Sequence, residues 1–320
     1  MKTTHLPNLT IIGAGSIGLL YFHLLKNTKI FNLSFCDTRI KYQKKFSTKF
    51  TIPYKNTILA KNSYFFAKIT PKDKIIDTNI VLITVKAYQV KKICEEIKPY
   101  LPKKALVIIM CNGMGAQFEA KEILKNNKVF FATTSNGSTH KKYQVFHNGF
   151  GDTFLGINNH ILPKILKILV KRLPRAFVTI DINKILYSKL AINAIINPLT
   201  VKYHCKNGEL INYPDSIQQI AQEIAIIYKK LKINLTFDDI FNNALKVIQN
   251  TRNNYSSMYQ DYAFKRKSEI DYILGFLIKK AELFNLEIPH IKELYNFLKG
   301  QEKYDNSKCP KGSYRGCTRC

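Results

Sequence analysis

The sequence predicts an α/β fold in which a doubly wound parallel sheet is followed by a C-terminal all-helical domain. In the first half of the chain, short apolar runs alternate with helical stretches, which is typical of a parallel sheet covered by helices. From about residue 183 onward, apolar residues recur at spacings of three and four, as on amphipathic helices. The 320 residues also exceed the length at which one hydrophobic core stops growing, so two domains are expected.

The first domain is expected to span residues 1–182. Residues 8–12 form a short apolar run that predicts a buried strand, and a glycine-rich turn and a helix over residues 19–26 follow it. Further strands are predicted at residues 31–36, 64–67, 80–85, 105–111, 129–134 and 178–180, a hairpin at 143–156, and helices at 88–98, 116–125 and 161–172. This order of elements places helices on both faces of the sheet.

The second domain is expected to span residues 183–302 and to contain only helices. They are predicted at residues 183–197, 216–231, 238–250, 267–284 and 290–298. The change of pattern near residues 181–184 marks the boundary between the domains. Residues 303–320 are expected to form a flexible tail.

The composition excludes several classes of protein. Hydrophobic residues make up 46% of the chain, too many for a disordered protein, and no apolar run approaches the roughly 20 residues of a membrane-spanning helix. The first residues lack the apolar segment of a secretory leader, so we expect a cytoplasmic protein.

The net charge of +28 suits nucleic acid, a membrane surface or small anions as partners, but it also suits a general preference for lysine along the chain. Neither an RNA-binding aromatic signature nor a basic amphipathic helix accompanies the charge. Nucleic acid and membrane are therefore not expected as partners.

Seven cysteines are present. Cys36, Cys94 and Cys111 lie in or beside apolar segments and are expected to be reduced and buried. Near the end of the chain lie Cys309, Cys317 and Cys320. These three thiols fall short of the four ligands of a structural zinc site. No metal site is therefore expected.

The glycine-rich turn has the sequence Gly13-Ala14-Gly15-Ser16-Ile17-Gly18, with a predicted strand before it and a predicted helix after it. This context is typical of the Rossmann-type dinucleotide-binding turn. The first glycine allows the tight turn, the second allows the backbone to approach a pyrophosphate, and the third allows the helix to pack on the strand. A plain glycine turn in an α/β protein is the alternative interpretation.

The residues after the second predicted strand bear on the choice between NADH and NADPH. Asp37 lies where an acidic residue would accept the ribose hydroxyl of NAD, and Arg39 follows two residues later. Residues 38–72 contain nine basic residues and no acidic residue. These basic side chains would stabilise the 2′-phosphate of NADPH, and the planar guanidinium of Arg39 suits a bidentate contact with it. We therefore predict NADPH. A solvated lysine-rich surface would explain the same run.

A narrow polar stripe runs along the first predicted helix of the second domain. Lys189, Asn193 and Asn197 are spaced by four, so they share one face of a helix that is otherwise apolar. Because buried amide and ammonium groups are costly without partners, the stripe is expected to face a substrate pocket between the domains. Burial there would lower the pKa of Lys189 and suit it to proton donation. An exposed polar stripe is the alternative, but a solvated face would show more polar positions.

Four more residues are candidates with structural alternatives. Lys86 and Asn112 each follow a predicted strand at the carboxyl edge, where α/β proteins bind ligands. Ser257 and Glu269 lie in the helical half. A surface lysine would explain Lys86, a helix cap would explain Ser257, and a pair with a basic residue among 265–267 would explain Glu269.

Together these segments resemble the ketopantoate reductase (2-dehydropantoate 2-reductase) family, over nearly the whole chain. The segments that carry the resemblance are Gly13-Ala14-Gly15-Ser16-Ile17-Gly18, Val85-Lys86-Ala87-Tyr88-Gln89-Val90, Asn112-Gly113-Met114-Gly115, residues 189–200, Asn207-Gly208-Glu209-Leu210, Ser256-Ser257-Met258-Tyr259-Gln260-Asp261 and Ser268-Glu269-Ile270-Asp271-Tyr272.

The resemblance implies a role for each matching residue. Lys189 would be the proton donor. Substrate contacts would come from Lys189 together with Asn112, Asn193, Asn197, Asn207 and Ser257. Cofactor contacts would come from the glycine turn and from Arg39, Lys86, Asn112, Ser138 and Glu269. The family usually has a basic residue after the second strand, and an ungapped comparison places Asp37 there, whereas a shift of two residues places Arg39.

The implied reaction is the NADPH-dependent reduction of 2-dehydropantoate to pantoate in pantothenate biosynthesis. Hydride would pass from the nicotinamide to the ketone carbon, and Lys189 would protonate the oxygen. One alternative is a reductase of another branched 2-keto acid on the same scaffold. The other is a non-catalytic dinucleotide-sensing or nucleic-acid-binding protein. The expected partner is a small 2-keto acid, and the chain is expected to be a monomer or a homodimer.

Overall fold

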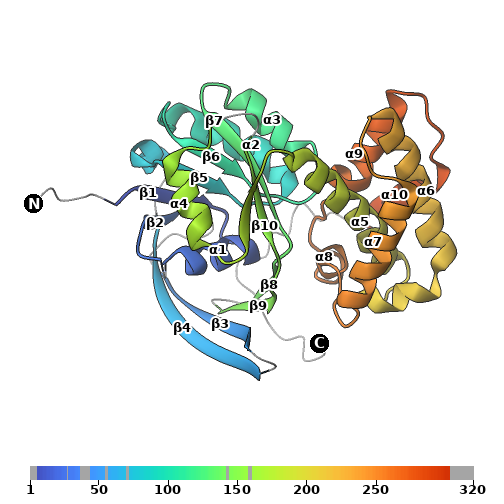
Figure 1. The fold of residues 1–320 in the computed structure, drawn as a ribbon, viewed down its shortest axis with the longest axis horizontal. Coiled ribbons are helices and arrows are strands. Elements are labelled where there is room, and N and C mark those ends of the chain that lie inside the picture. The colour runs from blue at the N-terminus through green and yellow to red at the C-terminus, as the bar shows by residue number, and fades with distance from the viewer. Residues whose placement is uncertain are drawn as a thin grey trace, which may run out of the picture.

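The computed structural model describes residues 6–26, 28–36, 44–54, 57–69, 72–141, 144–157 and 161–302. A part built on a mixed sheet lies beside a part built from helices (Figure 1). The predictions for Asp37, Arg39 and the cysteine-bearing tail fall outside the described residues.

The described strands form one sheet in the order β11-β10-β7-β6-β5-β1-β2-β4-β3-β9-β8. In chain order they are β1 (Asn8–Ile12), β2 (Asn32–Cys36), β3 (Lys44–Tyr54), β4 (Thr57–Ile69), β5 (Ile80–Ile83), β6 (Leu106–Ile109), β7 (Lys128–Thr134), β8 (Gly137–Lys141), β9 (Gln144–Gly149), β10 (Thr153–Gly156) and β11 (Ala176–Thr179). The central strands β2, β1, β5, β6 and β7 are parallel, as the alternation of elements predicts.

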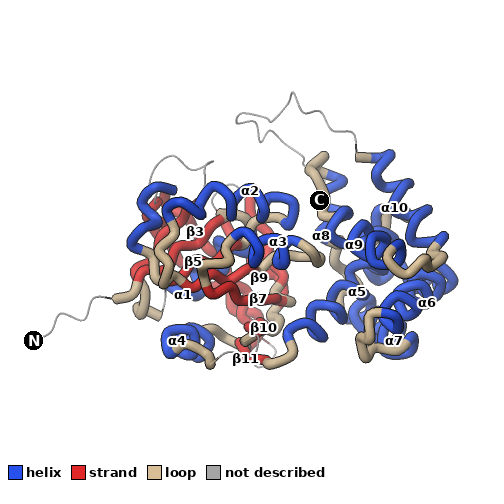
Figure 2. Tube along the Cα trace, turned by 90° about the horizontal axis from the view of Figure 1, so that it is seen from above, coloured by secondary structure: helices blue, strands red, loops and turns tan. Residues whose placement is uncertain are grey.

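Side chains of the central strands alternate between two hydrophobic cores. On β5, Ile80 and Leu82 point into one core, whereas Val81 and Ile83 point into the other. Helices α1 (Ser16–Lys26) and α4 (Lys164–Arg172) cover the first face, and α2 (Ala87–Ile97) and α3 (Ala116–Ile123) cover the second. Figure 2 shows α2 and α4 on opposite sides of the strands. The fold is therefore the predicted doubly wound sheet.

The helical part is organised around one long helix, α5 (Ile182–Lys202). The other elements there are η3 (Asn207–Asn212, a 3-10 helix), α6 (Pro214–Lys230), α7 (Phe237–Asn250), α8 (Ser257–Ala263), α9 (Ile270–Glu282) and α10 (Pro289–Gln301). Helices α6 to α10 all contact α5, which also contacts β7 and β10 of the sheet. Helix α5 therefore brings a functional side chain within reach of both parts of the protein.

Two regions of the sheet differ from the prediction. The strand predicted at residues 64–67 is part of the longer β4, which pairs with β3 in an antiparallel hairpin that projects from the body (Figure 1). The two strands at residues 143–156 do not form the predicted hairpin with each other: β9 pairs with β8 and β3, whereas β10 pairs with β7 and β11. The frequent lysines of residues 44–69 and the polar β8 sequence hide the apolar alternation by which strands are recognised.

The helix predicted at residues 267–284 begins later, at Ile270, because Ser268 and Glu269 form the turn before it. Cys36 and Cys94 are buried as expected, whereas Cys111 is only partly buried. No helix of the described residues is long and apolar enough to span a bilayer.

Candidate active site

The glycine turn connects β1 to α1, and each of its glycines meets a different environment. Gly13 has a φ of 101°, and a Cβ atom there would lie 2.7 Å from Cγ1 of Val85. A Cβ atom on Gly18 would overlap the carbonyl oxygen of Gly13. Packing therefore requires the first and third glycines.

The second glycine is different. A Cβ atom on Gly15 would have no described atom within 4 Å. Packing among the described residues therefore does not require this glycine, whereas close approach of a ligand to the backbone would. The residues present fit a dinucleotide pyrophosphate at this turn.

Strand β8 lies against the glycine turn. The hydroxyl of Ser138 donates to the carbonyl oxygen of Ser16 at 3.1 Å, and Nδ1 of His140 lies 2.9 Å from the hydroxyl of Ser16. The structure thus places Ser138, a predicted cofactor contact, beside the turn. His140 was not predicted, because a lone histidine in a polar strand carries no pattern.

Lys189, on α5, reaches the carboxyl ends of β6 and β7. Its ammonium donates to Oδ1 of Asn112 at 3.1 Å, to the hydroxyl of Thr133 at 3.2 Å and to the carbonyl of Thr134 at 2.6 Å. Burial lowers the pKa of Lys189 to about 8, although the charge of Glu269 acts in the opposite direction. The lowered pKa agrees with the expectation from the apolar helix.

Glu269 joins this cluster from the turn before α9. Its carboxylate lies 3.3 Å from the ammonium of Lys86 and accepts from the backbone N–H of Ala87 at 3.0 Å and from Nδ2 of Asn112 at 3.4 Å. The alternative pairing of Glu269 with a basic neighbour among residues 265–267 is not what the structure shows. Asn112 therefore lies between Lys189 and Glu269 and contacts both.

Asp261, on α8, completes the ion pairs. Its carboxylate is 2.6 Å from the ammonium of Lys86 and 3.1 Å from Nε of Arg266, and the side chain is only 5% exposed. Burial acts to lower the pKa of Lys86, but the charges of Glu269 and Asp261 outweigh it and raise the pKa to about 12. Lys86 is thus not the surface lysine that its sequence alone would allow.

The remaining predicted residues lie outside this cluster of contacts. Asn193 is half-buried and Asn197 is buried, one and two turns after Lys189 on α5. Nδ2 of Asn207 donates to the hydroxyl of Thr251 at 2.8 Å, whereas its buried Oδ1 has no partner among the described residues. Ser257 is exposed at the start of α8.

The capping alternative that was considered for Ser257 applies to its neighbour. Ser256 is the N-cap of α8, and its hydroxyl accepts from the backbone N–H of Tyr259 at 3.0 Å. The hydroxyl of Ser257 is therefore not required for capping.

Comparison with known proteins identifies the family. Residues 9–160 match the family described as "Ketopantoate reductase PanE/ApbA", and residues 181–302 match "Ketopantoate reductase PanE/ApbA C terminal". The chain belongs to the ketopantoate reductase family. It is accordingly an oxidoreductase.

Individual relatives support the assignment. The chain is 33% identical over 237 residues to a 2-dehydropantoate 2-reductase of Vibrio cholerae, covering 72% of this chain and 80% of that protein. It is 26% identical over 300 residues to a 2-dehydropantoate 2-reductase of Yersinia pestis, covering 92% and 95%.

Solved structures share the fold. A D-mandelate dehydrogenase with NADH and anilino(oxo)acetate has a TM-score of 0.80 at 20% identity, covering 92% of this chain and 98% of that one. A PanE/ApbA family ketopantoate reductase of Ralstonia eutropha JMP134 has a TM-score of 0.79 at 18% identity with the same coverage.

Proposed function

We propose that this chain reduces 2-dehydropantoate to pantoate in pantothenate biosynthesis, using NADPH and a proton from Lys189. The observation that carries the proposal is the position of the Lys189 ammonium. It lies at the carboxyl edge of the sheet, in contact with Asn112 and with the end of β7, and its pKa is about 8. Such a lysine is mostly protonated near neutral pH and still gives up its proton readily.

The bound cofactor would supply the hydride, and this chain would supply alignment and charge. The glycine turn and Ser138 would hold the dinucleotide. Lys189 would stabilise the negative charge that develops on the substrate's carbonyl oxygen and then protonate it. Because three acceptors already use the three N–H groups of the Lys189 ammonium, the substrate oxygen must replace one of them.

The rest of the substrate would lie along α5 and α8. Asn193 and Asn197 would hydrogen-bond its hydroxyl end, Asn207 offers an amide oxygen that has no partner among the described residues, and Ser257 would bind its carboxylate. Closure of the two domains around the substrate would exclude water from the hydride.

The preference for NADPH is supported by the sequence after β2. Arg39 and the basic residues up to Lys72 would favour the 2′-phosphate. Asp37 would favour NADH, the cofactor bound to the structurally similar D-mandelate dehydrogenase.

Initial rates of NADPH and NADH oxidation with 2-dehydropantoate test the proposal directly. A panel of branched and aromatic 2-keto acids is the comparison, and the highest kcat/KM is expected for 2-dehydropantoate with NADPH. A higher kcat/KM for another keto acid would replace the proposed substrate. Absence of turnover with every acid between pH 6 and pH 9, while NADPH still binds, would favour a sensor.

A further inference from the structure

A partly buried polar network lies behind the contacts of Lys189, and Asn136 is its centre. Asn136 follows β7 by two residues, and both its backbone N–H and its Nδ2 donate to the hydroxyl oxygen of Thr134, at 3.1 and 2.8 Å. Its Oδ1 accepts from the backbone N–H of Gly151 at 3.1 Å and lies 2.9 Å from Nε2 of His147. One amide thus joins the end of β7 to β9 and to the loop before β10.

The orientation of this amide follows from its neighbours. The N–H of Gly151 can only donate, so the atom facing it must be Oδ1, and Nδ2 must face Thr134. Nε2 of His147 then carries a proton and donates to the same oxygen. Since every polar atom of the Asn136 side chain has a partner, the amide itself has one orientation in the network.

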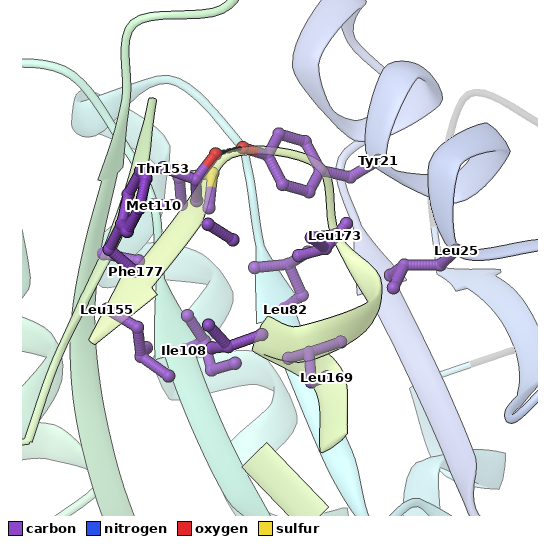
Figure 3. A pocket seen from close by; sticks show the side chains of 13 residues that line it. Tyr21, Leu25, Leu82, Ile108, Met110, Thr153, Leu155, Leu169, Leu173 and Phe177 are labelled. Carbon is purple, nitrogen blue, oxygen red and sulfur yellow. Dashed lines mark hydrogen bonds between the residues drawn. The ribbon is translucent and has the colours of Figure 1, made fainter. Parts of the chain in front are cut away.

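The network continues to α1. The hydroxyl of Thr153 lies 3.3 Å from that of Thr134, and Tyr21 hydrogen-bonds to Thr153. Figure 3 shows Tyr21 and Thr153 meeting at one end of an otherwise apolar pocket, whose lining includes Leu169 and Leu173. Nδ2 of Asn136 also donates to the hydroxyl of Thr153 at 3.4 Å, so Asn136 contacts both threonines of this part of the network.

Thr134 connects the network to the proposed proton donor. Its hydroxyl accepts both hydrogen bonds from Asn136, and its carbonyl accepts the shortest hydrogen bond of the Lys189 ammonium, at 2.6 Å. Thr133, which also contacts Lys189, is the preceding residue of the same strand. The position of this strand end therefore sets the direction in which the ammonium points.

We propose that Asn136 is a positioning residue for the reduction: it fixes the end of β7 so that Thr133 and Thr134 hold the Lys189 ammonium toward Asn112. This inference rests on the proposed function of Lys189. Asn136 touches neither Lys189 nor Asn112, so it acts through Thr134.

The electrostatic consequence has a definite sign. The groups that face Lys189 are neutral acceptors on β7 and Asn112, the carboxylate of Glu269 before α9 and the thiol of Cys111 at the end of β6. An acceptor that holds the ammonium stabilises its charged form. Loss of a well-placed Thr134 carbonyl should therefore lower the pKa of Lys189, with the charge of Glu269 unchanged.

The test is a double-mutant cycle of Asn136→Ala and Thr134→Val, which removes either side of the Asn136–Thr134 contact while keeping the Thr134 carbonyl. Each variant should lower kcat roughly tenfold and move the alkaline limb of its pH profile down by about half a unit. The double variant should add little to either single variant. Asn148→Ala is the matched control: its amide is in the same hairpin but contacts the hydroxyl of Thr139, 2.9 Å away, and kcat should not change.

A second readout does not depend on turnover. The pKa of Lys189 is measured by NMR of the Cε resonances of ¹³C-labelled lysines, which keep all three N–H groups, assigned with Lys189→Arg, in the wild-type protein and in the three single variants. A downward shift in Asn136→Ala and Thr134→Val, absent in Asn148→Ala, supports positioning. An unchanged or raised pKa, or additive effects in the double variant, overturns it. Failure of the wild-type protein to reduce any 2-keto acid contradicts the proposed function, whereas the NMR titration still decides the role of Asn136.

Discussion

The pH dependence of kcat is the sharpest test of the site, because two opposed effects set the pKa of Lys189. Burial lowers this pKa to about 8, and the charge of Glu269 partly counteracts the effect of burial. A proton donor must be protonated to act, so kcat should be constant below the pKa and fall above it. With a pKa of about 8, about nine-tenths of the enzyme is protonated at pH 7 and about one-tenth at pH 9.

The assay is the initial rate of NADPH oxidation at saturating 2-dehydropantoate between pH 6 and pH 10. We expect kcat at pH 9 to be about a tenth of its plateau value. Lys189→Ala should lower kcat by roughly 10²-fold and remove the alkaline limb of the profile, the decrease of kcat above the pKa. Glu269→Gln should move the limb to lower pH, because it removes a charge that raises the pKa of Lys189.

Two results would refute this reasoning. One is a wild-type kcat that stays constant from pH 7 to pH 9.5, which would mean that Lys189 is not the proton donor. The other is an alkaline limb that persists unchanged in Lys189→Ala, because another group would then be titrating.

Three further predictions concern other parts of the chain. Arg39→Ala should raise the Kd of NADPH far more than that of NADH, and equal changes by fluorescence titration would assign the 2′-phosphate to another residue. Glu223→Ala should lower the free energy of unfolding by about 2 to 3 kcal/mol, because this buried carboxylate accepts from the backbone N–H groups of His290 and Ile291 at the start of α10. Urea unfolding measures this free energy, and a variant with the midpoint of the wild-type protein would contradict the prediction. Gly113→Ala should lower both thermal stability and kcat, because the φ of Gly113 is +74° and a Cβ atom there would lie 2.8 Å from the Tyr272 carbonyl carbon. Unchanged thermal stability and kcat would mean that the turn at Gly113 and helix α9 separate easily.

The parts of the fold that were predictable are those that local pattern determines. The central strands are apolar on both sides because helices cover both faces, so β1, β5, β6 and β7 appear in the sequence as continuous apolar runs. Helix α5 is recognisable because Lys189, Asn193 and Asn197 interrupt an apolar cylinder at a spacing of four. The long β3–β4 hairpin has no such signal.

The candidate site was only partly predictable, because its contacts join residues far apart in the chain. An apolar helix with one lysine indicates that the ammonium needs partners, but it does not identify Thr133 and Thr134, which lie more than 50 residues earlier. Asp261 lay inside a recognised segment, yet only the fold brings it to Lys86. The roles of Asn193, Asn197, Asn207 and Ser257 toward a substrate remain predictions.

The two lysines of the site show how one network produces opposite acid strengths. Lys189 is surrounded by neutral acceptors that match the three N–H groups of its ammonium, so burial determines its pKa and lowers it to about 8. Lys86 lies against two carboxylates, whose charges outweigh burial and raise its pKa to about 12. Glu269 lies between them and contacts Lys86 directly, but it reaches Lys189 only through the amide of Asn112.

This difference between the pKa values suits the two lysines to different tasks. A lysine that gives up a proton near neutral pH can act in the reduction, whereas one that stays charged can only bind or hold other groups. One substitution distinguishes the two lysines. Asp261→Asn removes a charge that raises the pKa of Lys86 but that does not act on Lys189. The alkaline limb of kcat should therefore stay near pH 8 in Asp261→Asn, and a limb that moved with this variant would place the proton on Lys86 instead.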